Sequence, residues 1–341
     1  GDRIHEARIV GRGRAVCIRT ALVSPTIDDV VAAKRLVWRA WSGEIATSLH
    51  RDVVVHASAP IGRLDGFDAA QETIGDQLTV SLTSPDWEPY LFLGGVWEDQ
   101  VWVAHTGHLS GVFTEGLWGI PPSGQRVSLR YGNFSRVENG ATVEVRMLFD
   151  VLGLAAQSGI HLLPEPPGRN CLPPGPAEAN GIVQGTSHYA ESQHTLELVE
   201  AMLGGCNRLD GRDLESMGMA AYWHDDMVWH GPHGIGSTFG FQEFQDFAQG
   251  PSVSSFPNRR GGFHQARIAD GLTAAFTGWP SLRGDFTGES FRGIEPTGTP
   301  IGQNIMDFYV RRGDKLHENW VLIDLVDFAA QCGVDLLEGL S

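Results

Sequence analysis

The sequence predicts an α+β protein built from two similar domains in tandem. The segment His50–His56 (HRDVVVH) returns as His224–His230 (HDDMVWH), 174 positions later, and the same offset carries Asp150 onto Asp324. A repeat of this length suits two whole domains and is far too long for a solenoid. In each half, apolar residues recur first at helical spacing and then in alternating runs bounded by glycine and proline. Helices followed by strands favour helices packed on one face of an antiparallel sheet.

Composition and charge narrow the classes of function. The 341 residues are 42% hydrophobic, which is typical of a folded protein, and the net charge is -16. This negative charge disfavours nucleic acid as a binding partner. The sequence has no long apolar run, so we expect no membrane-spanning helix and no signal peptide, and a cytoplasmic protein. The four cysteines form no C-x-x-C pair, which indicates reduced thiols: Cys17, Cys171, Cys206 and Cys332.

The first copy is expected to span residues 1–163, with residues 1–24 as an N-terminal extension. Apolar residues at helical spacing predict a helix over residues 28–46. Valine- and tryptophan-rich runs predict strands at residues 90–94, 101–106, 127–134 and 141–151. An Asn-Gly pair between the last two strands predicts a tight hairpin turn.

Prolines mark the boundary between the copies. Six prolines between residues 163 and 185 exclude a continuous helix or central strand, so residues 164–186 are predicted to be a stiff linker. The second copy then covers residues 187–341. It is expected to contain helices at 189–207 and 212–222 and strands at 227–230, 262–270, 272–277, 302–311 and 316–324.

A curved sheet with helices on its concave face forms a cone whose mouth is a ready pocket. We expect two such cones. Two duplicated domains can bury their sheet faces against each other, so we expect an intrachain pseudo-dimer, with a homodimer as a further possible assembly.

Several short motifs in the second copy resemble one known family. Tyr222–Pro232 (YWHDDMVWHGP), Gly240-Phe241 and Gly313–Asp324 (GDKLHENWVLID) are similar, in order and spacing, to the SnoaL-like polyketide cyclases of the NTF2-like fold. The resemblance implies a cone-shaped α+β barrel with an internal apolar pocket. The cyclases use an aspartate after the tryptophan of this tail as general acid/base. Here that position is Val321, and Met147 in the first copy, so another residue does the task or the protein is not a cyclase.

His230, His224 and Asp307 are the predicted catalytic residues. His224 and His230 share strand parity and have carboxylates nearby, and such a histidine is a good base near neutral pH. The alternative is that both are structural. Together with His233 they form no recognised zinc spacing, so we predict no metal and no cofactor.

Asp307 lies two residues from Tyr309, so both are expected on one strand face with Gln303 and Ile305. An apolar setting would raise the carboxyl pKa and suit it to acid/base work, whereas an outward-facing, solvated aspartate is the alternative. The first copy has Asn133 at this position, so the second copy is the better candidate for chemistry.

Aromatic and amide side chains of the second copy are the predicted substrate contacts, with core packing as the alternative for each tryptophan. They are Trp229, His233, Trp279, Asn304, Tyr309, Asn319 and Trp320. Glu318 and Asp324 recur in the first copy as Glu144 and Asp150, which favours structural roles for both pairs.

These observations predict a small-molecule enzyme with proton-transfer chemistry of the lyase, isomerase or cyclase type. Its substrate would be a carbonyl or cyclic, polyketide-like molecule enclosed in the second copy. The alternative is a binding module that holds a small molecule without turning it over, favoured by the missing acid/base at Val321. A scaffold for protein partners ranks last, since it rests on fold analogy alone.

Overall fold

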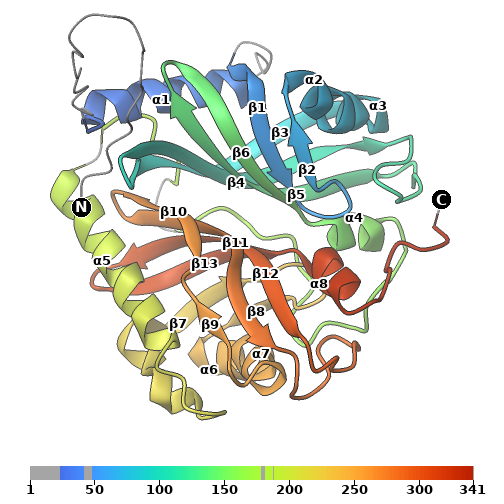
Figure 1. Cartoon of the computed structure of the whole chain (residues 1–341), viewed down its shortest axis with the longest axis vertical. Helices are drawn as coiled ribbons and strands as arrows, with labels where there is room; N and C mark the ends of the chain where they lie inside the picture. The colour runs from blue at the N-terminus through green and yellow to red at the C-terminus, as the bar shows by residue number, and fades with distance from the viewer. Residues whose placement is uncertain (1–23, 42–47, 178–180, 187, 341) are drawn as a thin grey trace, which may run out of the picture.

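The computed structural model describes residues 24–41, 48–177, 181–186 and 188–340. The two copies lie one above the other, with their sheets facing each other in the middle and most helices outside (Figure 1). The predicted N-terminal extension falls almost wholly outside the described residues.

The first copy begins with a helix that is capped by its own sequence. Thr26 accepts a hydrogen bond from the Asp29 N–H while the Asp29 carboxylate accepts from the Thr26 N–H, a reciprocal capping box. The elements of this copy are α1 (Ile27–Arg39), β1 (Leu49–Ala57), β2 (Arg63–Asp65), α2 (Phe67–Ala70), η3 (Gln71–Asp76), α3 (Gln77–Ser81), β3 (Leu82–Trp97), β4 (Gln100–Phe113), β5 (Arg126–Glu138), β6 (Ala141–Phe149) and α4 (Val151–Gln157).

The second copy repeats this plan with a longer first helix. Its elements are α5 (Tyr189–Cys206), η4 (Leu214–Met217), η5 (Met219–Ala221), β7 (Trp223–His230), β8 (Ser237–Phe239), α6 (Phe241–Phe244), η6 (Gln245–Gln249), α7 (Gly250–Ser255), β9 (Arg260–Gly261), β10 (His264–Asp270), β11 (Thr273–Asp285), β12 (Pro300–Arg312), β13 (Lys315–Ile323) and α8 (Leu325–Gln331). The helix predicted at 212–222 is two short 3₁₀ turns.

Strand order is the same in both copies. The sheets run β2-β1-β6-β5-β4-β3 and β8-β7-β13-β12-β11-β10, with β9 attached to β11. All neighbours pair antiparallel except β1 with β6 and β7 with β13, which are parallel. The predicted tandem α+β fold is therefore confirmed, and it differs from the expected antiparallel, barrel-like sheets in two details. Each sheet is mixed and open, because its two edge strands do not pair with each other.

The hairpin predicted from the Asn-Gly pair is present. Asn139 and Gly140 link β5 to β6 with φ values of 50° and 77°. Both residues thus adopt the left-handed conformation that a tight two-residue hairpin requires and that asparagine and glycine tolerate best.

The faces of the two sheets that carry no helices pack against each other. A shared apolar layer between them contains Leu91, Trp102, Phe134, Leu148, Ile268, Met306, Phe308, Trp320 and Leu322, all buried. At Gly132 a Cβ atom would stand 3.1 Å from both Leu322 Cδ1 and Met306 Sδ, so the glycine allows the close approach. This sheet-on-sheet contact is the predicted intrachain pseudo-dimer.

The two recurring aspartates hold this interface in a reciprocal way. Asp150 caps α4 and accepts a hydrogen bond from the His233 N–H in the second copy, at 2.9 Å. Asp324 caps α8 and accepts from the Ala59 N–H in the first copy, also at 2.9 Å. Ala59 and His233 are themselves 174 positions apart, so the contact has the self-complementarity of a two-fold interface. The recurring aspartates thus have the structural role that their repetition favoured.

A buried ion pair adds a contact outside this symmetry. The Lys34 ammonium on α1 lies 2.6 Å from an Asp270 carboxylate oxygen at the end of β10, and both side chains are almost fully buried. Such a pair is costly to break, because removal of one partner leaves an unpaired buried charge.

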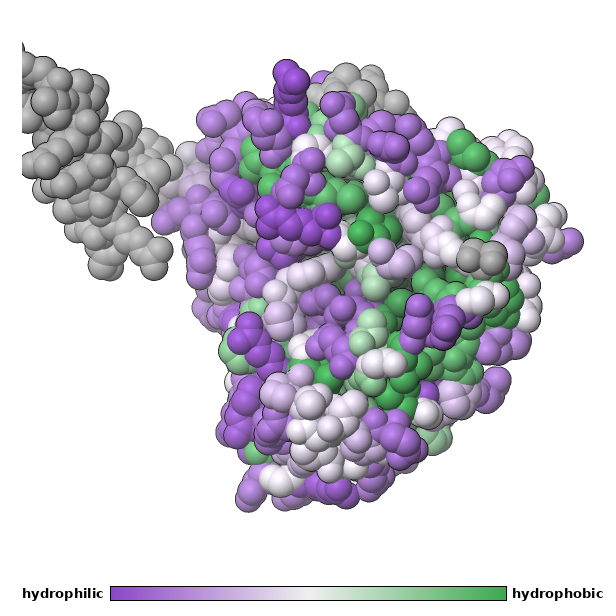
Figure 2. Space-filling view, turned by 45° about the vertical axis from the view of Figure 1, so that its right-hand side comes forward, coloured by the Kyte–Doolittle hydropathy of each residue, from purple (hydrophilic) through white to green (hydrophobic). Residues whose placement is uncertain are grey.

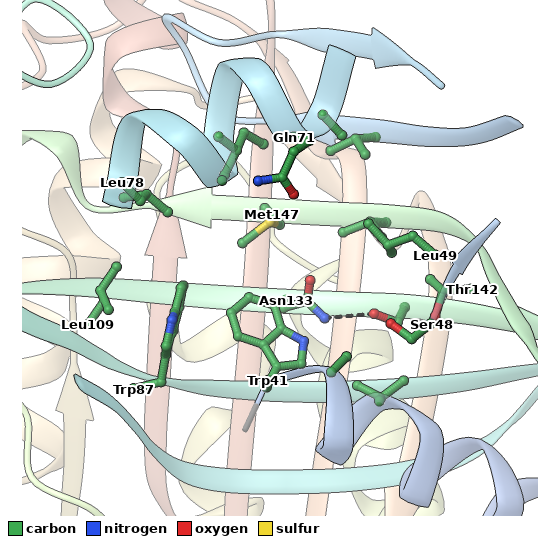
Figure 3. A pocket seen from close by; sticks show the side chains of 18 of the residues that line it. Trp41, Ser48, Leu49, Gln71, Leu78, Trp87, Leu109, Asn133, Thr142 and Met147 are labelled. Carbon is green, nitrogen blue, oxygen red and sulfur yellow. Dashed lines mark hydrogen bonds between the residues drawn. The ribbon is translucent and has the colours of Figure 1, made fainter. Parts of the chain in front are cut away.

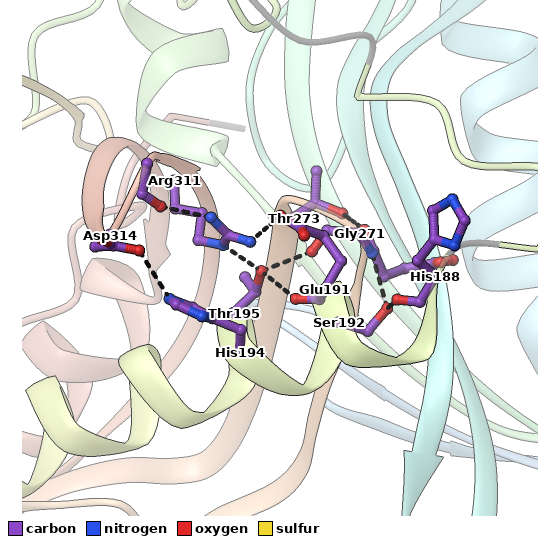
Figure 4. Close-up of polar contacts among 11 residues, drawn as sticks. His188, Glu191, Ser192, His194, Thr195, Gly271, Thr273, Arg311 and Asp314 are labelled. Atoms are coloured by element: carbon purple, nitrogen blue, oxygen red, sulfur yellow. Dashed lines mark hydrogen bonds and ion pairs between the residues drawn. The ribbon is translucent and has the colours of Figure 1, made fainter.

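Hydrogen bonds and an ion pair connect the long helix α5 to the sheet of its own copy (Figure 4). The Arg311 guanidinium donates to the Thr195 hydroxyl at 2.7 Å and also pairs with Glu191. Thr195 is fully buried and donates to the Gly271 carbonyl at 2.6 Å. These groups satisfy each other, which is the requirement for burying polar side chains under a helix.

The residues between α4 and α5 pack against both copies. Ile182 pairs with Phe92 of the first copy, and Arg169 pairs with Ser237 of the second. The Trp320 indole N–H donates to the Pro174 carbonyl at 2.8 Å, and Glu318 accepts from the Ala177 N–H. The described residues of this segment, here called the interface strap, therefore run along the contact between the two copies.

The surface is mostly hydrophilic on the face shown in Figure 2, with hydrophobic side chains gathered in patches toward its right-hand part. Among the helices described, none is long and apolar enough to cross a membrane.

Candidate functional site

Each copy holds a cavity between its helices and the inner face of its sheet. The cavity of the second copy, here called the copy-two pocket, has a volume of about 180 Å³. β12 supplies Gln303, Ile305, Asp307 and Tyr309 to its floor, and β13 supplies Asn319. The alternation predicted for this strand is therefore the one observed.

Asp307 is the central polar group of this pocket. Its Oδ1 accepts hydrogen bonds from the Tyr309 hydroxyl at 3.0 Å and from the Asn319 amide at 3.2 Å. Burial raises the pKa of the Asp307 carboxyl to about 7, and the two hydrogen bonds oppose that rise only in part. Near neutral pH this carboxyl is therefore close to half protonated, which suits a group that both accepts and returns a proton.

A second buried aspartate shows why a raised pKa is not enough to mark a site. Burial also raises the pKa of Asp324 to about 7. However, Asp324 accepts from the backbone N–H groups of Ala59 and Asp327 and does not line the pocket. Of these two aspartates, Asp307 is the one that combines the raised pKa with a place on the wall of the copy-two pocket.

The register of β12 and β13 relates Asp307 to the missing family acid/base. Asp307 is the direct cross-strand partner of Val321, the position at which the cyclase tail carries its aspartate. Such partners have their Cβ atoms about 5 Å apart on one face of the sheet. A carboxyl at Asp307 thus enters the same part of the cavity from the neighbouring strand.

A cation also lies on the pocket wall. The Arg259 guanidinium donates to the Ser252 hydroxyl at 2.7 Å, and no carboxylate of the described residues is within ion-pair distance of it. The charges of Arg259 and Asp307 both act on the pKa of the Cys206 thiol, lowering and raising it respectively, beneath a larger rise from burial. The pocket therefore contains a base and an uncompensated positive charge.

His264 lines the same pocket, and its hydrogen bonds define its tautomer. Arg267 Nε–H donates to Nδ1 at 2.7 Å, so Nδ1 is the acceptor and Nε2 carries the proton toward the Ser281 hydroxyl 3.0 Å away. Burial, aided by the charge of Arg267, lowers the pKa of His264 to about 3. His264 is therefore a neutral donor and does not activate Ser281 as a nucleophile.

The remaining wall is aromatic and amide in character. The lining includes Trp223, Trp229, Phe244 and Phe276, and two buried amide atoms, Gln303 Nε2 and Gln249 Oε1, have no hydrogen-bond partner. Aromatic walls favour a flat ligand, and unpaired buried amide atoms favour one with polar groups.

Four of the predicted site residues therefore meet in one cavity: Asp307, Tyr309, Asn319 and Trp229. Four further lining residues were not among the predicted site residues: Arg259, His264, Cys206 and Gln249. None of these belongs to a motif or repeat that would have drawn attention to it.

The expected convergence of His230 with Asp307 is not found. Trp229 faces the pocket, so its neighbour His230 faces the other copy, where its ring lies 5.2 Å from that of Trp320. Burial and the charge of Arg130 lower the pKa of His230 to about 3, which keeps the imidazole neutral.

His224 and His233 also lie outside the copy-two pocket. The His224 Nε2 is 2.7 Å from the Arg312 carbonyl oxygen beside the β12–β13 turn. His233 lines a separate cavity between the copies. No three His, Cys, Asp or Glu side chains in the described parts of the chain are grouped as a metal site.

Three further predicted contacts face the first copy. Trp320 is fully buried in the apolar layer between the sheets. Trp279 lies beside His56 and Arg146 of the first copy. Asn304, whose neighbours Gln303 and Ile305 line the pocket, points to the opposite side of β12 and approaches Asp327 at 3.4 Å.

The copy-one pocket has a different character (Figure 3). It encloses about 130 Å³, and none of its described lining residues is an acid, a base, a tyrosine or a cysteine. Asn133 occupies the place of Asp307, donates to the Ser135 hydroxyl at 2.9 Å and keeps a buried Oδ1 without a partner. Trp41 and Trp87, with ring centroids 4.4 Å apart, form one wall.

Comparison with known proteins identifies both copies. The family model described as SnoaL-like polyketide cyclase matches residues 29–158 and again residues 207–332. Among curated proteins, none matches the chain in sequence.

Solved structures of the same kind match one copy-sized part of the chain. IdmH, a putative polyketide cyclase from Streptomyces antibioticus, is 21% identical, with 41% of this chain and 99% of that chain covered and a TM-score of 0.34. AclR, a putative hydroxylase from Streptomyces galilaeus, is 17% identical over 42% of this chain and 82% of its own, with a TM-score of 0.34. A putative SnoaL-like polyketide cyclase from Jannaschia sp. CCS1 is 16% identical over 42% and 94%, with a TM-score of 0.35.

Proposed function

The chain belongs to the SnoaL-like polyketide cyclase family, and on that premise we propose that its second copy is an enzyme that moves protons on a carbonyl substrate. The substrate is a flat, cyclic, polyketide-like molecule held in the copy-two pocket. The observation that carries this proposal is the buried Asp307 carboxyl, with a pKa near 7, directly across from Val321.

The reaction begins with enolisation. The Asp307 carboxylate takes a proton from the carbon next to the substrate carbonyl, and the electron pair of the broken C–H bond moves onto the carbonyl oxygen. The Arg259 charge and the Gln303 amide N–H stabilise the resulting enolate. Return of the proton from Asp307 to another carbon completes an isomerisation. In a cyclisation, the enolate attacks a second carbonyl and Asp307 protonates the new alkoxide.

Deuterium exchange tests the first step without knowledge of the natural substrate. The full chain is incubated with an enolisable aryl ketone, α-tetralone, in deuterium oxide, and loss of the α-proton signal is followed by NMR. We expect the exchange rate to rise with pH and level off above about pH 7, as Asp307 loses its proton.

The matched variants are Asp307→Asn and Asp324→Asn, because both remove a buried aspartate with the same raised pKa. Asp307→Asn is expected to reduce exchange by about 10²–10⁴-fold, the range of general-base catalysis. Asp324→Asn should exchange at the wild-type rate wherever it is folded. Equal rates in wild type and Asp307→Asn would refute the proposal.

The copy-one pocket supports a second function, the binding of a neutral ligand. None of its described lining residues is an acid, a base, a tyrosine or a cysteine, and this lining and the unpaired Asn133 Oδ1 favour an apolar, aromatic molecule with a hydroxyl donor. We expect 2-naphthol to quench the fluorescence of Trp41 and Trp87 with an affinity that does not change across the neutral pH range. Asn133→Leu should weaken 2-naphthol but not naphthalene; equal weakening of both would contradict this role.

A further inference from the structure

A third cavity lies between the two copies and belongs to neither of the pockets described above. Its volume is about 280 Å³. β5 and α4 of the first copy, residues 231–236 of the second copy and residues 161–173 of the interface strap form its walls.

A buried cation without a counter-charge lines this cavity. The Arg130 side chain is 3% exposed, and its two terminal nitrogens donate to the carbonyl oxygens of Gly231 at 2.8 Å and His230 at 3.0 Å. Carbonyls satisfy hydrogen bonds but carry no net charge. No carboxylate of the described residues lies within 4 Å of this guanidinium. An uncompensated buried charge costs several kcal/mol.

The neighbouring groups do not offset this charge. Burial and the charge of Arg130 together lower the pKa of His108 to about 4 and that of His230 to about 3, so both are neutral at pH 7. Among the described lining residues, Asp150 is the one carboxylate, and its oxygens already accept from the N–H groups of Gly153 and His233.

A second arginine lies at the opening of the inter-copy cavity. Arg169 is mostly exposed and pairs with Glu243 at 2.9 Å. His161, His233 and Cys171 also line this cavity. Glu243 pairs with Arg169, so Arg130 is the guanidinium of this cavity that has no carboxylate of the described residues within ion-pair distance. A buried cation without a paired anion favours an anionic ligand at this place.

The internal repeat shows that packing does not require the arginine. The residue 174 positions after Arg130 is Asn304, which faces the interface from β12 of the second copy. The reciprocal contacts of Asp150 and Asp324 obey the approximate two-fold symmetry between the copies, whereas the pair Arg130 and Asn304 does not. The charge is thus a special feature of one end of the interface.

We propose that the inter-copy cavity binds a small organic anion, whose carboxylate offsets the charge of Arg130 and meets Arg169 at the mouth. This cavity shares no lining residue with the copy-two pocket, although the charge of Arg130 contributes to lowering the pKa of Asp307 against the larger rise from burial.

Two cysteines report on the two sites independently. Cys171 is exposed and lines the inter-copy cavity, whereas Cys206 lines the copy-two pocket. Alkylation of each thiol by iodoacetamide can be followed by peptide mass spectrometry on the full chain. The probes are benzoate and its neutral isostere benzamide.

We expect benzoate to slow alkylation of Cys171 roughly tenfold at ten times its Kd, by mass action, and to leave Cys206 unaffected. Benzamide should give no protection, and added salt should weaken the effect of benzoate. The proposal would be overturned if both probes protected Cys171 equally. It would also be overturned if inorganic phosphate protected Cys171 in place of benzoate, or if Cys171 were not protected at all.

Three variants test which arginine supplies the positive charge that binds benzoate. Arg130→Gln is expected to abolish protection by benzoate and Arg169→Gln to reduce it several-fold. Arg212→Gln is the matched control, because Arg212 is an exposed arginine paired with Glu289 away from this cavity. If Arg130→Gln fails to fold, the contrast between Arg169→Gln and Arg212→Gln decides: equal protection in those two variants would contradict the assignment.

Discussion

The two pockets occupy the same place in two copies of one fold, yet they differ in nearly every polar group. Four positions of the copy-two pocket correspond, at the constant offset of 174, to chemically simpler residues in the copy-one pocket. Asp307, Tyr309, Asn319 and Trp229 stand where the first copy has Asn133, Ser135, Val145 and Val55. The cavity with the ionisable carboxyl is also the larger, about 180 Å³ against about 130 Å³.

This difference shows how a duplicated fold can separate stability from chemistry. The contacts that join the copies recur in both halves, as Asp150 and Asp324 show. A buried carboxyl such as Asp307 lowers the stability of the folded state, and among the described lining residues of the two pockets one occurs in the second copy and none in the first. The first copy keeps the fold and loses the titratable group.

The largest expected effect is a loss of stability, and it distinguishes a substitution on the interface face of the second sheet from one on its pocket face. Trp320→Ala removes a fully buried side chain between the copies and should lower the free energy of unfolding by about 3–5 kcal/mol. Trp229→Ala acts on the pocket wall and should weaken ligand binding with a smaller loss of stability. Urea denaturation and α-tetralone titration of both variants check this. A loss of ligand binding in folded Trp320→Ala with no loss of stability would reverse the assignment of the faces.

The next effect concerns stability and pH. Folded Asp307 holds its proton up to about pH 7, whereas an unfolded aspartate loses it near pH 4, so rising pH favours the unfolded chain between these values. Asp307→Asn removes this penalty. The variant should match the wild type below about pH 4 and exceed it by up to about 4 kcal/mol above pH 7.

Denaturation at several pH values measures this difference. A wild type that is more stable than Asp307→Asn at pH 8 would show that the folded carboxyl is not raised in pKa.

The smallest effect concerns the tuning of Asp307. The Tyr309 hydroxyl donates to the carboxylate and so lowers its pKa. Tyr309→Phe should raise the pKa of Asp307 by less than about one unit, since one hydrogen bond contributes about 1 kcal/mol. The midpoint of the pH–rate profile for deuterium exchange would move upward. A downward shift would mean that Tyr309 does not stabilise the ionised form.

The sequence was enough to predict which residues share a strand face. Gln303, Ile305, Asp307 and Tyr309 lie together as the two-residue period requires, and His224 and His230 also share parity. Parity does not say which face looks into the cavity, however. Apolar character normally decides this, but here both faces of each sheet are covered, one by helices and one by the other copy.

That double coverage explains why the predicted site residues divide between two faces. Trp229 and Trp320 are both buried tryptophans on adjacent strands, yet one lines the pocket and the other the interface. For the same reason, the sequence does not show that His230 and Asn304 lie on the face opposite the pocket. Arg259 and His264 reach the pocket through tertiary packing and belong to none of the recurring motifs, so no pattern in the sequence predicts their place there.

One measurement tests the central claim, that proton chemistry resides in the second copy alone. Deuterium exchange of α-tetralone is compared in Asp307→Asn and in its mirror variant, Asn133→Asp. We predict that Asp307→Asn abolishes the catalysed exchange and that Asn133→Asp leaves it at the wild-type rate. Undiminished exchange in Asp307→Asn would contradict the account.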